Sequence, residues 1–230
     1  MAQQNFIQFA AKSVFIMLLI LFGLLAGCGG EKSSSQDQAG TPREIDEGIE
    51  YKLIKPPVPT DTGDKIEVVE LFWYMCPHCY RAEPEVQAWK KTIPENVVFK
   101  RVPAIFSEQW VFHARVFYTA KALGVLEKIH TPLFDSIHKH KQKIVSAKAM
   151  AQFFNKHAGT DVALFESTFN SFGVDANVRG ALDLSKRYQA GGVPSMIVNG
   201  KYITDGPMND GHPGMMETVN FLIKKEMSKK

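Results

Sequence analysis

Apolar and polar positions along the chain predict strands on either side of a block of helices. KIEVVELFWY (65 to 74) is β-branched, aromatic and almost entirely apolar, which is typical of a central strand buried on both faces. VVFKRV (97 to 102) predicts a second strand. In SMIVNGKYI (195 to 203), Asn199-Gly200 separates two apolar halves, and this dipeptide favours a two-residue β-hairpin turn.

Helical spacing dominates the residues between these strands. A helix is predicted from Cys76 to about Lys91. Further along, apolar residues recur at intervals of three and four, as they do on the buried face of a helix. These repeats comprise Trp110, Ala114, Phe117, Ala120 and Gly124; Met150, Phe153 and Phe154; Leu164, Phe165 and Phe169; Val174, Val178, Ala181, Leu182 and Tyr188; and Met216, Val219, Ile223 and Met227.

Capping residues predict where these helices begin and end. Thr131-Pro132 is typical of an N-cap followed by proline at the first helical position. Ser146 and Asp161 are predicted N-caps, and the helix after Ser146 is expected to stop near Gly159. The helix that carries Val174 to Tyr188 is predicted to end at Gly191-Gly192. Pro213 is expected to open the last helix. Pro84 lies inside the first helix and is expected to kink or break it.

The predicted order is strand, helix, strand, helical block, helix, hairpin and helix. Apart from the helical block, this is the order of a thioredoxin fold. The fold class is therefore predicted as α/β, a thioredoxin fold with an inserted all-helical domain. We expect residues 49–104 and 178–230 to form the thioredoxin-like domain and 105–177 the insertion.

The N-terminal segment has the pattern of an export signal. Residues 14–25 are continuously apolar and follow Lys12. They are fewer than the roughly 20 that span a bilayer and match a signal core of about 7 to 15. Leu25-Ala26-Gly27-Cys28 then resembles a bacterial lipobox, which predicts a signal peptide at 1–27 and a lipid on Cys28. An ordinary cleaved signal and a short uncleaved anchor remain alternatives.

Residues 28–48 are rich in Gly, Ser and Gln without apolar periodicity, which predicts a flexible tether. The expected location is the periplasm, with the protein held to a membrane by its lipid. Gly29 after the cysteine slightly favours the outer membrane. Stable anchoring takes more than one acyl chain, and the lipoprotein modification supplies them.

The charge balance indicates no nucleic-acid partner. The formal net charge is +3, from 27 Lys+Arg and 24 Asp+Glu. No basic block is long enough to predict binding to nucleic acid. HKHKQK (138 to 143), the densest basic stretch, is interpreted as a solvated surface. His113, His130, His157 and His212 are single and scattered, and we expect them to be structural.

Two of the three cysteines lie together in WYMCPHCY (73 to 80). A disulfide between cysteines three residues apart closes a small ring, so it constrains the unfolded chain little. A reversible redox pair is therefore favoured over a structural disulfide. Half of a zinc site is the other alternative, but no second C-x-x-C or H-x-x-x-H completes four ligands. We expect no metal and no cofactor.

Position makes the two thiols unequal. Cys76 is expected at a helix N-terminus, where free backbone N–H groups stabilise a thiolate. Pro77 is tolerated in the first helical turn, and His78 can add a donor or a positive charge beside the sulfur. Cys79, one turn further in, is predicted to be buried with a higher pKa. The pair is then expected to act as an oxidant.

Three stretches resemble the DsbA family of bacterial periplasmic disulfide oxidases. They are VVELFWYMCPHCYRAEPE around the two cysteines, ALGVLEKIHTPLFDSI (122 to 137) and GGVPSMIVNGKY (191 to 202). The resemblance extends over residues 49–230. It implies that Cys76 is the attacked sulfur, Cys79 the resolving one, and Val193-Pro194 a cis peptide facing the disulfide. The backbone of Val193 would pair with an extended substrate.

Glu70 interrupts the buried strand, and a buried acid is costly unless it is paired. Lys100 on the next strand is the predicted partner. The resemblance implies that these two residues and Glu83 form a charged cluster beneath the thiols, in which Glu70 accepts or relays a proton for Cys79. A purely structural ion pair is the alternative for Glu70, and an exposed helix position is the alternative for Glu83.

The resemblance implies a thiol oxidase that takes electrons from reduced, unfolded exported proteins. A DsbB-like, quinone-linked membrane oxidase would then reoxidise the Cys76–Cys79 pair. A disulfide reductase or isomerase on the same fold is the alternative. Isomerases of the DsbC type carry an N-terminal dimerisation domain, whereas only a tether precedes the fold here. A non-catalytic lipoprotein scaffold is an alternative of another class.

Overall fold

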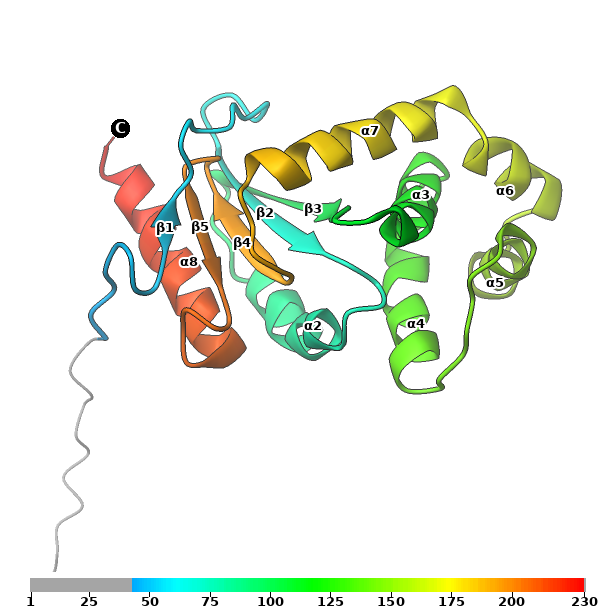
Figure 1. Ribbon diagram of the computed structural model, residues 1–230, viewed down its shortest axis with the longest axis horizontal. Coiled ribbons are helices and arrows are strands. Elements are labelled where there is room, and N and C mark those ends of the chain that lie inside the picture. Colours follow the sequence, from blue (N-terminus) through cyan, green and yellow to red (C-terminus); the bar gives the residue numbers. More distant parts are fainter. Residues whose placement is uncertain (1–42, 230) are drawn as a thin grey trace, which may run out of the picture. The chain divides into compact units, whose positions relative to one another are not determined.

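A computed structural model describes residues 43–229, whose frame is a mixed five-stranded sheet. The strand order is β1-β5-β4-β2-β3 (Figure 1). β2 runs parallel to β3 and antiparallel to β4, and β5 is antiparallel to both β4 and β1. The strands are β1 (Lys52–Leu53), β2 (Ile66–Phe72), β3 (Val97–Pro103), β4 (Ser195–Val198) and β5 (Tyr202–Asp205).

Seven helices accompany the sheet within the described residues. α2 and α8 cover one face, where Val86 and Trp89 of α2 join Val219 and Leu222 of α8 in one apolar cluster (Figure 1). A larger cluster joins the opposite face to the helices between β3 and β4. The helices are α2 (Pro77–Lys90), α3 (Glu108–Ala122), α4 (Leu126–His138), α5 (Ala147–Ala158), α6 (Val162–Phe169), α7 (Phe172–Arg187) and α8 (Gly211–Met227).

This arrangement is a thioredoxin fold with helices inserted between β3 and β4, as predicted. α3 to α6 lie within the predicted insertion. α7 continues from there without a break across residues 177–178. It ends at Arg187, six residues before Val193, which reaches the thiol site. The insertion is thus joined to the sheet by one rigid helix as well as by the chain after β3 (Figure 1).

β2 is buried along its whole length, as its sequence predicts. All seven of its residues are buried, including Glu67 and Glu70. Alternation places Ile66 and Val68 on the face of α2 and α8, and Val69 and Leu71 on the other. A strand enclosed on both faces leaves its acidic side chains dependent on partners from neighbouring elements.

Several of the predicted helix ends, and the predicted hairpin turn, are confirmed. Ser146 and Asp161 cap α5 and α6 by accepting hydrogen bonds from backbone N–H groups three residues on. Gly159 ends α5 in the left-handed region. Asn199 and Gly200 both have positive φ, which the predicted hairpin turn requires. α7 ends at Arg187, earlier than predicted, and β1, only two residues long, was not predicted.

Of the two predictions for prolines inside helices, the one for Thr131-Pro132 was wrong. α4 begins at Leu126, so Thr131-Pro132 lies within it instead of at its start. Gly124, with φ of 69°, makes the turn between α3 and α4, so the helix starts closer to α3 than the Thr-Pro signal suggests. α2 continues through Pro84 as one helix, so this proline does not break it. Burial of the neighbouring turns maintains each helix despite one missing backbone hydrogen bond.

Glu226 of α8 fixes the hairpin that follows Pro194. Its carboxylate accepts hydrogen bonds from Asn199, Lys201 and Tyr202, at 2.6, 2.6 and 2.9 Å. Burial raises the pKa of Glu226, but the hydrogen bonds from Lys201, Asn199, Lys229 and Tyr202 outweigh it and lower the pKa to about 2. The hairpin is thereby attached to α8 by an ionised, nearly buried carboxylate.

The predicted signal peptide (1–27), Cys28 and most of the tether lie outside the described residues. Between residues 43 and 229, no helix has both the length and the apolar composition that a membrane crossing requires.

Candidate active site

The two thiols lie where β2 leads into α2, as predicted. Cys76 is the N-cap of α2, with extended backbone angles of φ −79° and ψ 117°, and Pro77 opens the helix. The Cys76 Sγ accepts a hydrogen bond from the backbone N–H of Cys79 at 3.4 Å. Both cysteines are free thiols. The first turn of α2 therefore directs its unpaired donors at one sulfur.

The environments of the two sulfurs differ. Cys79 is completely buried, while Cys76 keeps 7% of its surface exposed. A hydrogen bond from the Cys79 thiol, the backbone N–H groups of Cys79 and His78, and the charge of His78 together lower the pKa of Cys76 to about 6, against the effect of burial. Burial and the neighbouring Cys76 raise the pKa of Cys79 well above its usual value. At neutral pH the reduced pair is one thiolate and one thiol.

His78 lies on the outer side of this turn. Its side chain is exposed, and its Nδ1 is 2.9 Å from the Arg81 guanidinium. It contributes to the thiolate through its backbone N–H and its charge. The predicted role of the His78 ring as a donor or positive charge beside the sulfur stays a prediction.

The loop before β4 lies against Cys76. The Val193–Pro194 peptide bond is cis, as predicted, and the Val193 carbonyl accepts a hydrogen bond from the Cys76 thiol at 3.4 Å. Beside it is a pocket of about 190 Å³, lined on one side by His78 and on the other by the loop and by His212. Cys76 and Val193, which are 117 positions apart in the sequence, are thus in contact at the Cys76 sulfur.

Aromatic side chains border the site on the side of the insertion. Trp73 stacks on Trp110 of α3, with ring centroids 4.0 Å apart and an interplanar angle of 5°. Phe106 packs on Trp110 and is 42% exposed. The carbonyl of Trp73 accepts a hydrogen bond from the Cys76 backbone N–H, so this aromatic surface is directly continuous with the thiol turn.

Beneath the thiols lies a buried ion cluster. The Arg101 Nε is 2.7 Å from the Glu70 carboxylate, and its Nη2 is 2.9 and 3.1 Å from the two oxygens of Glu83. All three side chains are at most 6% exposed. One guanidinium therefore serves two carboxylates in a nearly dry environment, where an unpaired charge would be costly.

The prediction that Lys100 belongs to this cluster was wrong. β2 and β3 pair so that Arg101 lies opposite Glu70 and Lys100 opposite Val69. Side chains alternate along a strand, so a shift of one residue changes the face. Lys100 consequently pairs with Glu67, at 2.7 Å, and with Asp61 on the other face. Glu83 belongs to the cluster, as predicted.

The two carboxylates of the cluster differ in proton affinity. Burial, reinforced by the charge of Glu83, raises the pKa of Glu70 despite Arg101. Burial also raises the pKa of Glu83, but hydrogen bonding to His130 and the charges of His130 and Arg101 lower it by more. The charge of Glu70 contributes to the raised pKa of Cys79. Glu70 is thus electrostatically coupled to the buried thiol.

Sequence reasoning missed the contribution of α4. His130, predicted as structural, is buried with its Nε2 3.5 Å from Glu83. His138, predicted to lie on a solvated surface, is 2.8 Å from the carbonyl of Tyr74. Tyr80 donates a hydrogen bond to Asp135 at 2.8 Å. Only the amphipathic spacing of α4 could have indicated a buried face, and spacing does not name the partner.

Comparison with known proteins gives a consistent result. The DSBA-like thioredoxin domain family matches residues 95–212, downstream of the two cysteines. The thiol:disulfide interchange protein DsbA of Azotobacter vinelandii is 41% identical over 210 residues, which cover 91% of this chain and 98% of that protein. The protein of the same name from Burkholderia cepacia is 36% identical over 220 residues, 95% of this chain and 99% of that protein.

Among solved structures, the crystal structure of Pseudomonas aeruginosa DsbA superposes with a TM-score of 0.77 at 39% identity, covering 80% of this chain and 96% of that one. The oxidoreductase DsbA from Xylella fastidiosa superposes with a TM-score of 0.73 at 31% identity, covering 78% and 96%. Both likenesses extend over nearly the whole of the solved chains.

The thiol of Cys76 is expected to titrate near pH 6. Its alkylation rate should rise with pH and reach half of its plateau there, because only the thiolate reacts. Since this pKa is depressed from 9.0, the folded dithiol form gains stability between about pH 6 and pH 9 and loses it as the pH falls through 6. In Cys76→Ser the step near pH 6 should vanish; a step that persists there contradicts the assignment.

Replacing Arg101 by Gln is expected to lower the free energy of unfolding by about 3–5 kcal/mol, because two carboxylates then remain buried without a cation. Lys100→Gln is the matched control, and urea unfolding at neutral pH measures both. Lys100→Gln should lower the free energy of unfolding by less, since the Lys100 side chain is 31% exposed and water can reach its partners. An equal or larger loss in Lys100→Gln would contradict the description of the cluster.

Proposed function

The chain belongs to the DsbA family of thiol:disulfide oxidoreductases, and we propose that it donates a disulfide between Cys76 and Cys79 to exported proteins as they fold. The observation that carries this proposal is the contrast between the two thiols. One sulfur lies at a helix N-terminus with its pKa lowered to about 6, and the other is buried with its pKa raised.

The reaction begins from the oxidised pair. A substrate thiolate attacks the Cys76 sulfur, the Cys76–Cys79 bond breaks, and Cys79 leaves and takes up a proton. A second substrate thiolate then attacks the substrate sulfur of the mixed disulfide, and Cys76 leaves as a thiolate. The substrate loses two electrons, and the Cys76–Cys79 pair gains them. The low pKa of Cys76 supports the second step because a stabilised thiolate is a good leaving group.

The same contrast supports the direction of transfer. Each unit by which the Cys76 pKa lies below the working pH stabilises the reduced form by about 1.36 kcal/mol. For a two-electron couple this raises the reduction potential by roughly 30 mV. The disulfide form lacks this stabilisation because its sulfur cannot ionise. A depressed Cys76 pKa therefore favours the protein as an electron acceptor.

Glu70 is proposed to supply or accept the proton that Cys79 exchanges. Its raised pKa makes it the carboxyl of the cluster that holds a proton more readily, and its charge acts on Cys79. Arg101 and Glu83 balance the cluster while the proton moves. In the alternative, Glu70 and Arg101 are a structural pair without a part in the exchange.

Substrates are proposed to bind as extended segments beside Val193. Its carbonyl already accepts a hydrogen bond from Cys76, and a backbone acceptor beside the reactive sulfur suits β-augmentation. Such backbone pairing does not depend on the side chains of the substrate. The exposed Phe106 and the Trp73–Trp110 stack extend this surface with apolar area, which suits unfolded chains.

We further propose that the protein works in the periplasm, attached to a membrane by lipid on Cys28, and that a DsbB-like membrane oxidase renews its disulfide. The lipobox-like Leu25-Ala26-Gly27-Cys28 and the Gly/Ser-rich residues after it support the anchor. The outer membrane is the proposed site.

The reduction potential tests the direction of transfer. Equilibration of the purified protein with glutathione buffers is expected to give a potential well above that of thioredoxin. Cys76→Ser should abolish thiol oxidation of a reduced, unfolded substrate, and Cys79→Ser should retain substrate as a mixed disulfide at Cys76. A thioredoxin-like potential would instead support the reductase alternative. Unchanged cellular function in Cys76→Ser would support the scaffold.

The anchor is tested by the full chain expressed in a bacterium that processes lipoproteins. The wild type is expected in the membrane fraction, with a mass increased by lipid on a chain that begins at Cys28. Cys28→Ala should lose both the added mass and the membrane association. An unmodified wild-type chain, or membrane association that survives Cys28→Ala, would support an ordinary signal or an uncleaved anchor instead.

A further inference from the structure

Tyr74, two residues before Cys76, is held at both of its polar ends by one helix of the insertion. Its hydroxyl is 2.9 Å from Nδ1 of His130, and its backbone carbonyl is 2.8 Å from Nε2 of His138. Both histidines belong to α4. They are eight residues apart, a spacing that places two side chains on the same apolar stripe of a helix.

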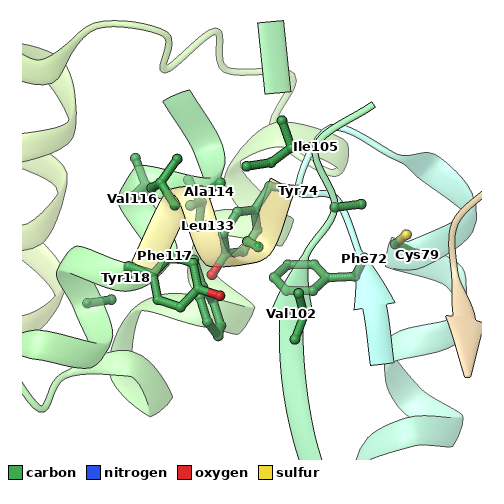
Figure 2. Close-up of a cluster of buried hydrophobic side chains, with 14 of the residues drawn as sticks. Phe72, Tyr74, Cys79, Val102, Ile105, Ala114, Val116, Phe117, Tyr118 and Leu133 are labelled. Atoms are coloured by element: carbon green, nitrogen blue, oxygen red, sulfur yellow. The ribbon is translucent and has the colours of Figure 1, made fainter. Parts of the chain in front are cut away.

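The ring of Tyr74 is enclosed where the sheet meets the insertion. It is completely buried and packs edge-on against Phe72, with centroids 5.1 Å apart. Figure 2 shows it among side chains of α3 and α4, including Ala114 and Leu133. A buried tyrosine hydroxyl needs a partner, and His130 provides it.

α4 also holds the other side of the thiol turn. Tyr80, one residue after Cys79, stacks on the ring of His138, with centroids 5.0 Å apart and an interplanar angle of 15°. Its hydroxyl donates to Asp135, also in α4. Tyr74, two residues before Cys76, and Tyr80, directly after Cys79, are thus both attached to the same helix.

We propose that His130 and His138 are positioning residues of the redox site, which hold Tyr74 by its hydroxyl and its carbonyl and thereby fix Cys76 against the first turn of α2. Neither histidine contacts a sulfur in the contacts described. The inference rests on the proposed function, because it explains how the reactive thiolate is kept in place.

The position of Cys76 needs such support because its stabilising contacts are short-range. The Cys76 Sγ lies 3.4 Å from the Cys79 nitrogen, whose N–H stabilises the thiolate. The Val193 oxygen, also 3.4 Å away, accepts a hydrogen bond only from the protonated thiol. Hydrogen bonds weaken steeply with distance and angle. Cys76 precedes the helix, so its N–H has no i to i−4 hydrogen bond, although its carbonyl accepts one from the N–H of Tyr80 at 3.1 Å. Its N–H instead bonds to Trp73, next to the held Tyr74.

Four variants separate positioning from packing. His138→Phe keeps an aromatic ring against Tyr80 but removes the donor to Tyr74. His138→Gln restores an N–H donor. Tyr74→Phe removes only the hydroxyl that meets His130. His157→Phe is the matched control, because His157 of α5 stacks on Phe153 at 4.2 Å and has no described contact with Tyr74.

The readouts are the pH midpoint of Cys76 alkylation in the dithiol form and the equilibrium constant with glutathione. His138→Phe and Tyr74→Phe are expected to raise the midpoint by about half a pH unit or more. Well below the midpoint, that corresponds to a roughly threefold smaller thiolate fraction. Well above the midpoint, it corresponds to a roughly threefold loss in the equilibrium constant with glutathione. His138→Gln should recover most of the shift, and His157→Phe should match the wild type.

A midpoint unchanged from wild type in both His138→Phe and Tyr74→Phe, with only a lowered melting temperature, overturns the proposal and leaves the histidines structural. If His138→Phe does not fold, Tyr74→Phe decides alone, since it removes a single oxygen atom. A thioredoxin-like potential in the wild type would reject the proposed direction of transfer. It would leave the midpoint comparison valid, because that comparison uses only the reduced protein.

Discussion

The burial of β2 on both faces is the constraint on which the rest of the structure depends. Every residue of this strand is buried, so the chain can reach solvent only beyond Phe72. The reactive turn is therefore placed at the rim of the sheet, and α2 starts there. Its buried Glu70 needs a cation, which β3 supplies by its register. Strand burial thus determines both the position of the thiols and the charges beneath them.

A second consequence is an uneven division of charge in the interior. Two carboxylates share one guanidinium, so the cluster has an excess of acid that burial makes unfavourable. Glu70 bears most of this cost, as its raised pKa indicates. The same excess disfavours a thiolate at Cys79, while the helix N-terminus favours one at Cys76. The two sulfurs differ chiefly because Cys79 is buried, while Cys76 receives the hydrogen bonds at the start of α2.

Much of this site could be predicted from the sequence, and the failures have identifiable causes. The motif and its place after a buried strand were sufficient for Cys76 and Cys79, and the resemblance to the DsbA family supplied the meeting with Val193-Pro194. Lys100 was chosen instead of Arg101 because adjacent basic residues differ only in the face they take, and strand register is not encoded locally. The histidines of α4 were missed because their partners are a backbone carbonyl and a hydroxyl, 64 and 56 residues away.

The recess of Cys76 beside Val193 limits which proteins can react. Cys76 has 7% of its surface exposed and a backbone carbonyl at its side, so in the proposed mode of binding the sulfur is reached by a chain that lies flat along the loop. A compact protein presents no such extended segment, so in this mode of binding a protein stops being a substrate once it has folded. Turnover then ends through the shape of the product, and the enzyme spares finished proteins without having to recognise them.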